Sequence, residues 1–380
     1  MSAKRRLVLV VAISRSGTSL VTGILAQLGF HVPQPEVKAD ATNPRGFSEP
    51  RWVVDFHKRL MRERRVTVFD SRPAAWEITA EAAEDEAAYR DLRSWLEVQF
   101  VGTDDVVVKD PRNGWFLPLW LRCADELGVE TSYVTMLRSA PEVVRSAREW
   151  YGTWQNDASR AASWLNYTLQ TESAARGARR AFVRYEDLLA DWPREIARVG
   201  ELLDVPRLAS VDRSEHPQIE AFIDPALRRS AVGWDAVEVP AAVRTRIDEA
   251  WAALSRLAEP GGDDDSARAS LDALREDYVR FYAEAEAIAQ SSVTAVGGRG
   301  RAGRPRPTDS GKRPVPSSDG RPPTGRVSIR GVAVGGRSAA RGLALVPIKV
   351  ALLVPPRYRE RVPLPVVRAG LWVVNSLRRS

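Results

Sequence analysis

Several residue types that often carry protein function are scarce in this chain, which has one cysteine, three histidines and six lysines among 380 residues. A single cysteine, Cys123, cannot form an internal disulfide, so a disulfide-stapled secreted fold is excluded and a reducing compartment is expected. The histidines are scattered and no cluster of metal-ligand residues is apparent, so no metal is expected. No apolar run reaches the length of a membrane-spanning helix, so none is predicted.

The N-terminus starts with basic residues and a short apolar run, as a signal peptide does. A phosphate-loop pattern follows the run where a signal peptide would have a small-residue cleavage site. Residues 5–13 are therefore interpreted as a buried strand. Together with the lone cysteine, this interpretation predicts a cytoplasmic protein.

Charge is distributed unevenly along the chain. Residues 1–290 hold 38 Lys/Arg and 46 Asp/Glu, a balance of −8, whereas residues 291–380 hold 18 and 3, a balance of +15. An acidic body argues against an enzyme that binds phosphates of a nucleic acid across a broad face. No specific nucleic-acid partner is expected for this body.

Composition divides the chain into three segments, of which residues 1–290 form the predicted domain. Residues 291–342 are rich in Gly, Pro, Arg and Ser and bury too little apolar surface to offset their ordering entropy, so a disordered linker is predicted. Residues 343–380 hold two short apolar runs broken by prolines and dotted with arginines. Two interpretations of this tail stay open: an anchor for an anionic membrane surface or a partner, or weakly constrained sequence.

Short β-rich runs alternate with longer helical patterns in the predicted domain, which indicates an α/β fold with a parallel sheet. The predicted strands are residues 7–13, 105–109, 131–137 and 180–184. Their continuous apolar character indicates burial on both faces of the sheet. The predicted helices are residues 18–28, 49–64, 81–100, 114–127, 141–150, 157–176, 191–203, 240–257 and 266–289. Functional residues of such sheets gather at the carboxyl ends of the strands.

A loop of mostly small residues follows the first predicted strand and opens a helix: Ser14, Arg15, Ser16, Gly17, Thr18 and Ser19. Small residues let backbone N–H groups point at a phosphate, and the helix N-terminus adds partial positive charge. A Walker A loop would have a lysine before Thr18, where Gly17 stands. The loop is expected to bind an anion without the lysine of an ATP or GTP hydrolase. A serine-rich turn with a helix N-cap is the alternative interpretation.

The residues Arg-Ser-Gly-Thr-Ser at 15–19 resemble the 5′-phosphosulfate loop of sulfotransferases that use 3′-phosphoadenosine 5′-phosphosulfate (PAPS), in the form that bacterial and Golgi-type members have. Residues 134–146 resemble the 3′-phosphate motif of the same family, with a strand that ends in Leu-Arg, a helix opened by Pro141 and a serine eight residues after the arginine. The resemblance implies that Arg138 and Ser146 bind the 3′-phosphate, which a guanidinium can contact through two hydrogen bonds.

Three further segments match family patterns in the same order, so that the resemblance spans residues 5–235: they are residues 43–49, 108–112 and 182–188. The resemblance implies a P-loop NTPase-like parallel sheet flanked by helices. It also implies that Tyr185 and Arg228 contact the nucleotide, although an ordinary surface role for Arg228 stays open. The chain departs from the family pattern at Leu20, where cytosolic members often have a tryptophan near the adenine, and at Pro111, where they have a catalytic histidine.

Sulfuryl transfer needs a cation at the bridging oxygen, where negative charge develops, and a base for the acceptor proton. Arg15 is the predicted cation, and Lys109 is predicted to help hold the sulfate. The resemblance to the arginine-type members implies Glu49 as the base. A structural role for Glu49 in the first turn of the next helix stays open, and His57 and Asp110 are alternative bases.

The leading prediction is therefore a PAPS-dependent sulfotransferase that acts on a hydroxyl of a carbohydrate or lipid-linked acceptor. Five aromatic residues would suit a sugar ring or the protein core: Trp150, Tyr151, Trp154, Trp164 and Tyr167. Two other functions stay open, a P-loop kinase that uses Mg·ATP and a non-catalytic scaffold whose basic tail binds an anionic surface. Membrane contact through residues 343–380, at the inner face of the cell membrane, would suit either an enzyme or a scaffold.

Overall fold

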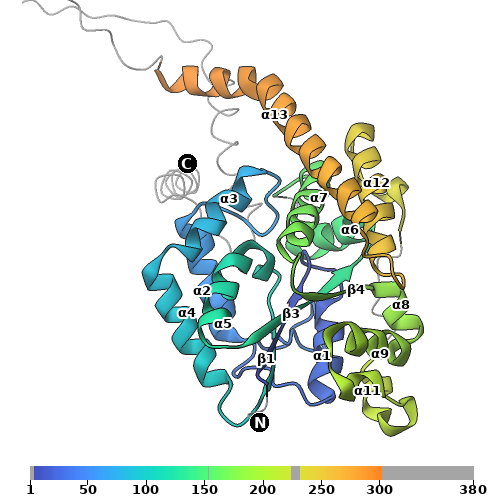
Figure 1. The fold of residues 1–380 in the computed structure, drawn as a ribbon. Helices are drawn as coiled ribbons and strands as arrows, with labels where there is room; N and C mark the ends of the chain where they lie inside the picture. Colours follow the sequence, from blue (N-terminus) through green and yellow to red (C-terminus); the bar gives the residue numbers. More distant parts are fainter. Residues whose placement is uncertain (1–3, 153, 224–231, 302–380) are drawn as a thin grey trace, which may run out of the picture. The chain divides into compact units, whose positions relative to one another are not determined.

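The computed structural model describes residues 4–152, 154–223 and 232–301, and the side chains up to residue 292. Met1–Ala289 forms a compact unit, shown in Figure 1. Residues 302–342 of the predicted linker and the tail 343–380 lie outside the described residues, as does Arg228. Among the described helices, none combines the length and apolar character that crossing a membrane requires.

Four parallel strands form the centre of the compact unit: β1 (Arg6–Val11), β2 (Asp105–Lys109), β3 (Glu130–Leu137) and β4 (Arg179–Arg184). They lie in the order β2-β1-β3-β4, and each neighbouring pair is parallel. After β1 the chain forms β2 on one side of β1, and it then forms β3 and β4 on the other side. The strand order therefore reverses at β1. Ligands of open α/β sheets bind beside such a point, at the carboxyl ends of the strands. The predicted α/β fold with a parallel sheet is confirmed.

The sheet is buried on both faces because alternate residues of β1 enter two separate hydrophobic clusters. Leu7, Leu9 and Val11 belong to one cluster, whereas Val8 and Val10 belong to the other. All five are completely buried. Apolar residues follow one another without interruption along β1 because helices cover both faces of the sheet, as the sequence predicts.

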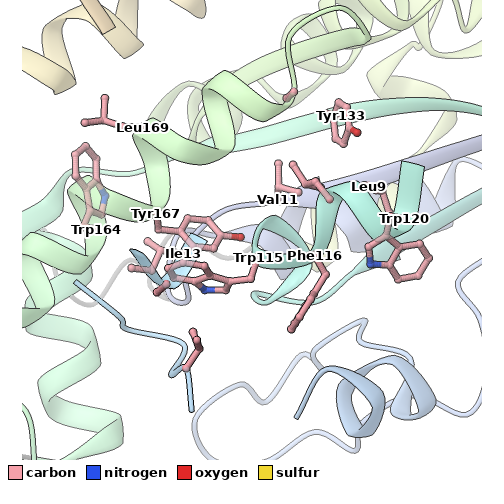
Figure 2. Packing of buried hydrophobic residues seen from close by; sticks show 14 of the residues in the cluster. Leu9, Val11, Ile13, Trp115, Phe116, Trp120, Tyr133, Trp164, Tyr167 and Leu169 are labelled. Carbon is pink, nitrogen blue, oxygen red and sulfur yellow. The ribbon is translucent and has the colours of Figure 1, made fainter. Parts of the chain in front are cut away.

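The larger cluster packs the sheet against aromatic residues that follow β2, of which Trp115, Phe116 and Trp120 are fully buried (Figure 2). Helices that contribute to it are α2 (Arg51–Glu63), α3 (Ala74–Ala80), α4 (Glu86–Gln99), α5 (Leu117–Glu126), α6 (Ala140–Tyr151), α7 (Asp157–Ala174), α12 (Ala241–Leu257) and α13 (Asp265–Arg301). The other face carries α1 (Thr18–Gln27), α8 (Tyr185–Ala190), α9 (Trp192–Leu203), α10 (Pro206–Ala209) and α11 (Pro217–Phe222).

The helices differ from the prediction in three places. The predicted helix 81–100 is interrupted, because the Asp85 carboxylate accepts hydrogen bonds from the N–H groups of Ala87 and Ala88 and caps a new helix, α4. The short helices α3, α8, α10 and α11 were not predicted. The last helix, α13, continues to Arg301, beyond the predicted end at residue 289.

Candidate active site

A cleft of about 310 Å³ lies where the four strands end. Each strand leads to a residue that lines it: Ser14 follows β1, Lys109 ends β2, Arg138 follows β3 and Tyr185 follows β4. Ten of the predicted site residues line the cleft: Ser14, Arg15, Gly17, Thr18, Ser19, Glu49, Lys109, Arg138, Ser146 and Tyr185. Ser16 is buried and is the one described site residue that does not line it. The topology thus gathers residues that are far apart in the sequence.

The loop after β1 has an unusual backbone that depends on Gly17. Arg15 and Gly17 both adopt left-handed conformations, with φ of 78° and 86°. A Cβ atom on Gly17 would lie 2.3 Å from Cδ2 of Tyr185, so the ring of Tyr185 packs directly against the loop. Gly17 precedes α1 without a side-chain cap, which leaves the first N–H groups of the helix suited to an anion.

Arg15, Arg138 and Ser146 form a polar cluster at the start of the loop, here called the arginine cluster. Arg15 Nε donates a hydrogen bond to Ser146 Oγ at 3.0 Å, and Arg138 Nη1 donates to the backbone oxygen of Arg15 at 2.9 Å. The guanidinium of Arg15 also lies 5.9 Å from the ring centre of Trp150. Two guanidinium groups and a hydroxyl therefore meet in the cleft.

Several elements hold Arg138 in place. Its Nε pairs with Glu142 at 2.7 Å, one turn into α6, and its backbone oxygen accepts a hydrogen bond from Trp164 Nε1 at 3.1 Å. Its guanidinium lies 4.9 Å from the ring centre of Tyr185. Helix α6 begins at Ala140, two residues after Arg138, with a proline in its first turn, and its Ser146 lines the cleft.

A second polar cluster, here called the lysine cluster, consists of Ser19, Glu49 and Lys109 at the other end of the loop. Lys109 Nζ donates to Glu49 Oε1 at 2.6 Å, to Ser19 Oγ at 3.2 Å and to the backbone oxygen of Phe47 at 3.2 Å. Lys109 is 3% exposed and Glu49 is 8% exposed. The ion pair is thus almost removed from water but borders the cleft.

The two predicted cations, Arg15 and Lys109, lie in different clusters, and Lys109 is the one that contacts the predicted base, Glu49. Arg15 was expected at the bridging oxygen of the donor, but its guanidinium lies beside Ser146 and Trp150. The cation in contact with Glu49 is Lys109. The loop therefore has a cation at each end.

His57 and Asp110, the alternative bases, are both fully buried and do not line the cleft. Trp120 Nε1 donates to His57 Nε2 at 3.1 Å, which places the histidine proton on Nδ1, 3.8 Å from Asp110 Oδ2. Burial lowers the pKa of His57 and outweighs the opposing effect of Asp110.

Burial tends to raise the pKa of Asp110, but the charge of Arg112 holds it well below its usual value. Arg112 Nη1 contacts both carboxylate oxygens, at 2.9 and 3.0 Å. Asp110 is therefore a poor proton acceptor. Glu49 is the one acidic residue among the described residues that line the cleft.

The structure places Leu20, which the comparison with the family pattern singles out, beside lining residues that the motifs did not reveal. Leu20, Leu189 and Phe222 form an apolar part of the cleft, and Phe222 lies so close to α1 that a Cβ atom on Gly23 would be 2.4 Å from its Cζ. Phe222 belongs to a short helix in no recognisable motif, so the sequence held no signal for it.

The five aromatic residues do not form one cluster with one role. Trp150 and Tyr151 line the cleft. Trp164 and Tyr167 belong to the core, with 2% and 1% of their surface exposed, whereas Trp154 is 60% exposed. Only the first two can contact a ligand in the cleft.

No family model and no curated protein matches the chain. Solved structures that are similar to it include two sulfotransferase domains. A sulfotransferase domain from the Synechococcus PCC 7002 olefin synthase has 20% sequence identity and a TM-score of 0.39, over 66% of this chain and 97% of that domain. A sulfotransferase domain from the curacin biosynthetic pathway has 16% identity and a TM-score of 0.36, over 65% of this chain and 97% of that domain. Sequence identities and TM-scores this low do not assign an activity to the chain. A proposed activity therefore depends on the residues of the cleft.

Proposed function

We propose that the protein transfers a sulfuryl group from PAPS to a hydroxyl. One observation carries this proposal: a single cleft holds two polar clusters, each with at least one cation, at the two ends of a loop suited to phosphate. PAPS has two anionic ends, a 3′-phosphate and a 5′-phosphosulfate. The separation of the clusters suits a donor with this double charge better than a ligand with one anionic group.

Each part of the donor has a proposed partner in the cleft. The arginine cluster binds the 3′-phosphate, and the loop N–H groups bind the 5′-phosphosulfate together with Lys109. Arg15 belongs both to the loop and to the arginine cluster, so its charge acts on both ends of the donor. The apolar part with Leu20, Leu189 and Phe222 accepts the adenine, with Tyr185 at its border.

The proposed reaction joins the acceptor oxygen to sulfur while the bond from sulfur to the bridging oxygen breaks. The electron pair of that bond stays on the 5′-phosphate, which leaves as adenosine 3′,5′-bisphosphate. Glu49 takes the acceptor proton, and the ammonium of Lys109 stabilises the charge that develops on the bridging oxygen. The acceptor is a carbohydrate or lipid-linked hydroxyl, for which Trp150 and Tyr151 supply an aromatic wall.

Thermal denaturation with adenosine 3′,5′-bisphosphate in EDTA, beside Mg·ATP, tests the donor site. A ligand that binds only the folded state stabilises it by about 2.7 kcal/mol at a hundred times its Kd. We expect the bisphosphate to raise the Tm without metal. We expect Arg138→Ala and Ser146→Ala to remove most of this shift. Arg145→Ala is the matched control, because Arg145 precedes Ser146 in α6 but pairs with Glu149 at the surface.

Two other outcomes would overturn the proposal. A shift with Mg·ATP alone would identify a P-loop kinase. A shift with neither ligand would favour a non-catalytic scaffold, and the basic segment after residue 301 would then be the place to search for function. The Ser146→Ala variant keeps the test decisive if Arg138→Ala unfolds the protein through loss of the buried ion pair with Glu142.

A further inference from the structure

Helix α2 turns a positively charged face toward the part of the cleft that holds Glu49. Arg51, Val54 and Lys58 recur at the spacing of one helix face, and all three line the cleft. Arg112 follows Lys109 by three residues and lines the same cleft. Arg51, Lys58 and Arg112 therefore add positive charge to this end of the cleft, besides that of Lys109.

The nearby carboxylates are already paired with other cations. Glu49 contacts Lys109 at 2.6 Å, and Asp110 contacts Arg112 at 2.9 Å. The remaining one, Asp55, is exposed on the same side of α2 as Arg51 and Lys58, which are also exposed. Within the ranges that the structure describes, neither Lys58 nor Arg51 takes part in an ion pair. Arg112 is thus paired with Asp110, whereas Arg51 and Lys58, in the part of the chain that the structure describes, are paired with no carboxylate.

The surroundings of Lys58 work against its positive charge. Loss of surrounding water lowers the pKa of Lys58, and the charge of Arg112 lowers it further. The negative charges of Asp55, Asp110 and Glu49 act in the opposite direction but do not reverse the shift. An anion bound between Lys58 and Arg112 would remove this repulsion.

Arg112 is well suited to bind such an anion. Its Nη1 is fixed by both oxygens of Asp110, so that the planar guanidinium is held at the border of the cleft before any ligand binds. A fixed guanidinium loses little freedom when it pairs with a carboxylate or phosphate. Lys58 adds a flexible second cation.

Building on the proposed sulfotransferase function, we propose that the acceptor is a sugar that carries an acidic group, a carboxylate or a phosphate, and that Lys58 and Arg112 bind this group. The acceptor hydroxyl then lies beside Glu49, and the sugar ring lies against Trp150 or Tyr151. Arg51, at the exposed rim, adds a longer-range attraction.

Chemical labelling of Lys58 tests this inference without a known acceptor. The whole chain has six lysines, so an amine-acylating reagent followed by peptide mass spectrometry resolves each one. The full-length protein is saturated with adenosine 3′,5′-bisphosphate and labelled with D-glucuronate, D-glucose 6-phosphate or D-glucose present. We expect one or both sugar acids to slow the labelling of Lys58, about tenfold at ten times their Kd, and glucose to have little effect. Lys4, which pairs with Glu130 at the surface, is the internal control.

Two variants show whether the protection comes from this face. Arg112→Gln is expected to weaken it, and Arg51→Gln serves as a second variant if the loss of the Asp110 contact disturbs folding. Arg59→Gln should leave it unchanged, because Arg59 lies next to Lys58 in α2 but pairs with Asp91 outside the cleft.

The outcome separates the inference from the donor assignment. Protection by glucuronate alone identifies a carboxylate, and protection by glucose 6-phosphate alone identifies a phosphate. If glucose protects equally, or neither acid protects at the highest concentration that leaves Lys4 unaffected, the inference is wrong while a bisphosphate shift still supports the donor site. If the acids protect Lys58 but the bisphosphate never stabilises the protein, the anion site stands and the donor assignment fails.

Discussion

Gly17 meets two restrictions at once, a left-handed backbone and the ring of Tyr185. Its φ is 86°, and a Cβ atom would lie 2.3 Å from Tyr185 Cδ2. Gly29, after α1, has a φ of 91° but no atom within 4 Å of its Cβ position. Gly29 thus has the left-handed backbone of Gly17 but no neighbouring ring, so it is a matched control for Gly17.

We predict that Gly17→Ala destabilises the protein more than Gly29→Ala does. The left-handed backbone costs both variants about 1–2 kcal/mol. The contact with Tyr185 adds about 1–3 kcal/mol for Gly17→Ala alone. Urea denaturation measures both free energies of unfolding, and the bisphosphate shift reports whether the loop is reshaped. Equal losses in the two variants would show that the ring of Tyr185 moves away at little cost.

At the scale of elements, the two consecutive arginines of β4 have opposite environments. Arg180 is directed inward, where it contacts Glu172 of α7 at 3.0 Å and Asp263, just before α13, at 2.7 Å. Its side chain is 4% exposed and that of Glu172 is 1% exposed. Arg179 pairs with Glu130 and is 42% exposed. The buried pairs therefore join β4 to two helical segments.

We predict that Arg180→Leu lowers the free energy of unfolding by about 3 kcal/mol, whereas Arg179→Leu lowers it by about 1 kcal/mol or less. The loss predicted for Arg180→Leu is at the low end of the range for breaking a buried ion pair, because Arg176 still contacts Glu172 at 2.6 Å. Urea denaturation of both variants measures the difference. Similar losses would mean that the inward arginine contributes no more than a surface ion pair.

At the scale of the whole molecule, His57 makes the stability of the fold depend on pH. It lies on the buried face of α2 against Phe116 and Trp120 of the aromatic core, and burial lowers its pKa. The unfolded chain takes up a proton on this histidine as the pH falls through about 6.5, whereas the folded protein takes it up only at a lower pH. Because the unfolded state then binds more protons, the stability is present above this pH and is lost below it.

We predict that the free energy of unfolding falls between about pH 7.5 and pH 5, with at most about 1.4 kcal/mol per pH unit coming from His57. His57→Gln should reduce this slope, because glutamine does not titrate. Urea denaturation of both proteins across this range measures the two slopes. Parallel slopes would assign the pH dependence to other groups.

The sequence by itself determined the kinds and order of the main elements and the residues of the phosphate loop. These features are local: a run of apolar residues predicts a buried strand, and small residues before a helix predict an anion-binding turn. The short helices α8, α10 and α11 escaped prediction because so few residues carry little periodic pattern, and packing decides whether they form. The interruption at Asp85 depends on a cap within an otherwise helical pattern.

Only the tertiary structure decided which of the candidate residues work together. Arg15 meets Ser146 across 131 residues and Lys109 meets Glu49 across 60, because the strand order β2-β1-β3-β4 brings their loops to one edge. Packing places His57 and Asp110 in the interior of the protein, although either side chain, like Glu49, could act as a base to judge from the sequence alone. Proximity and burial arise from contacts between distant segments, which no local pattern contains.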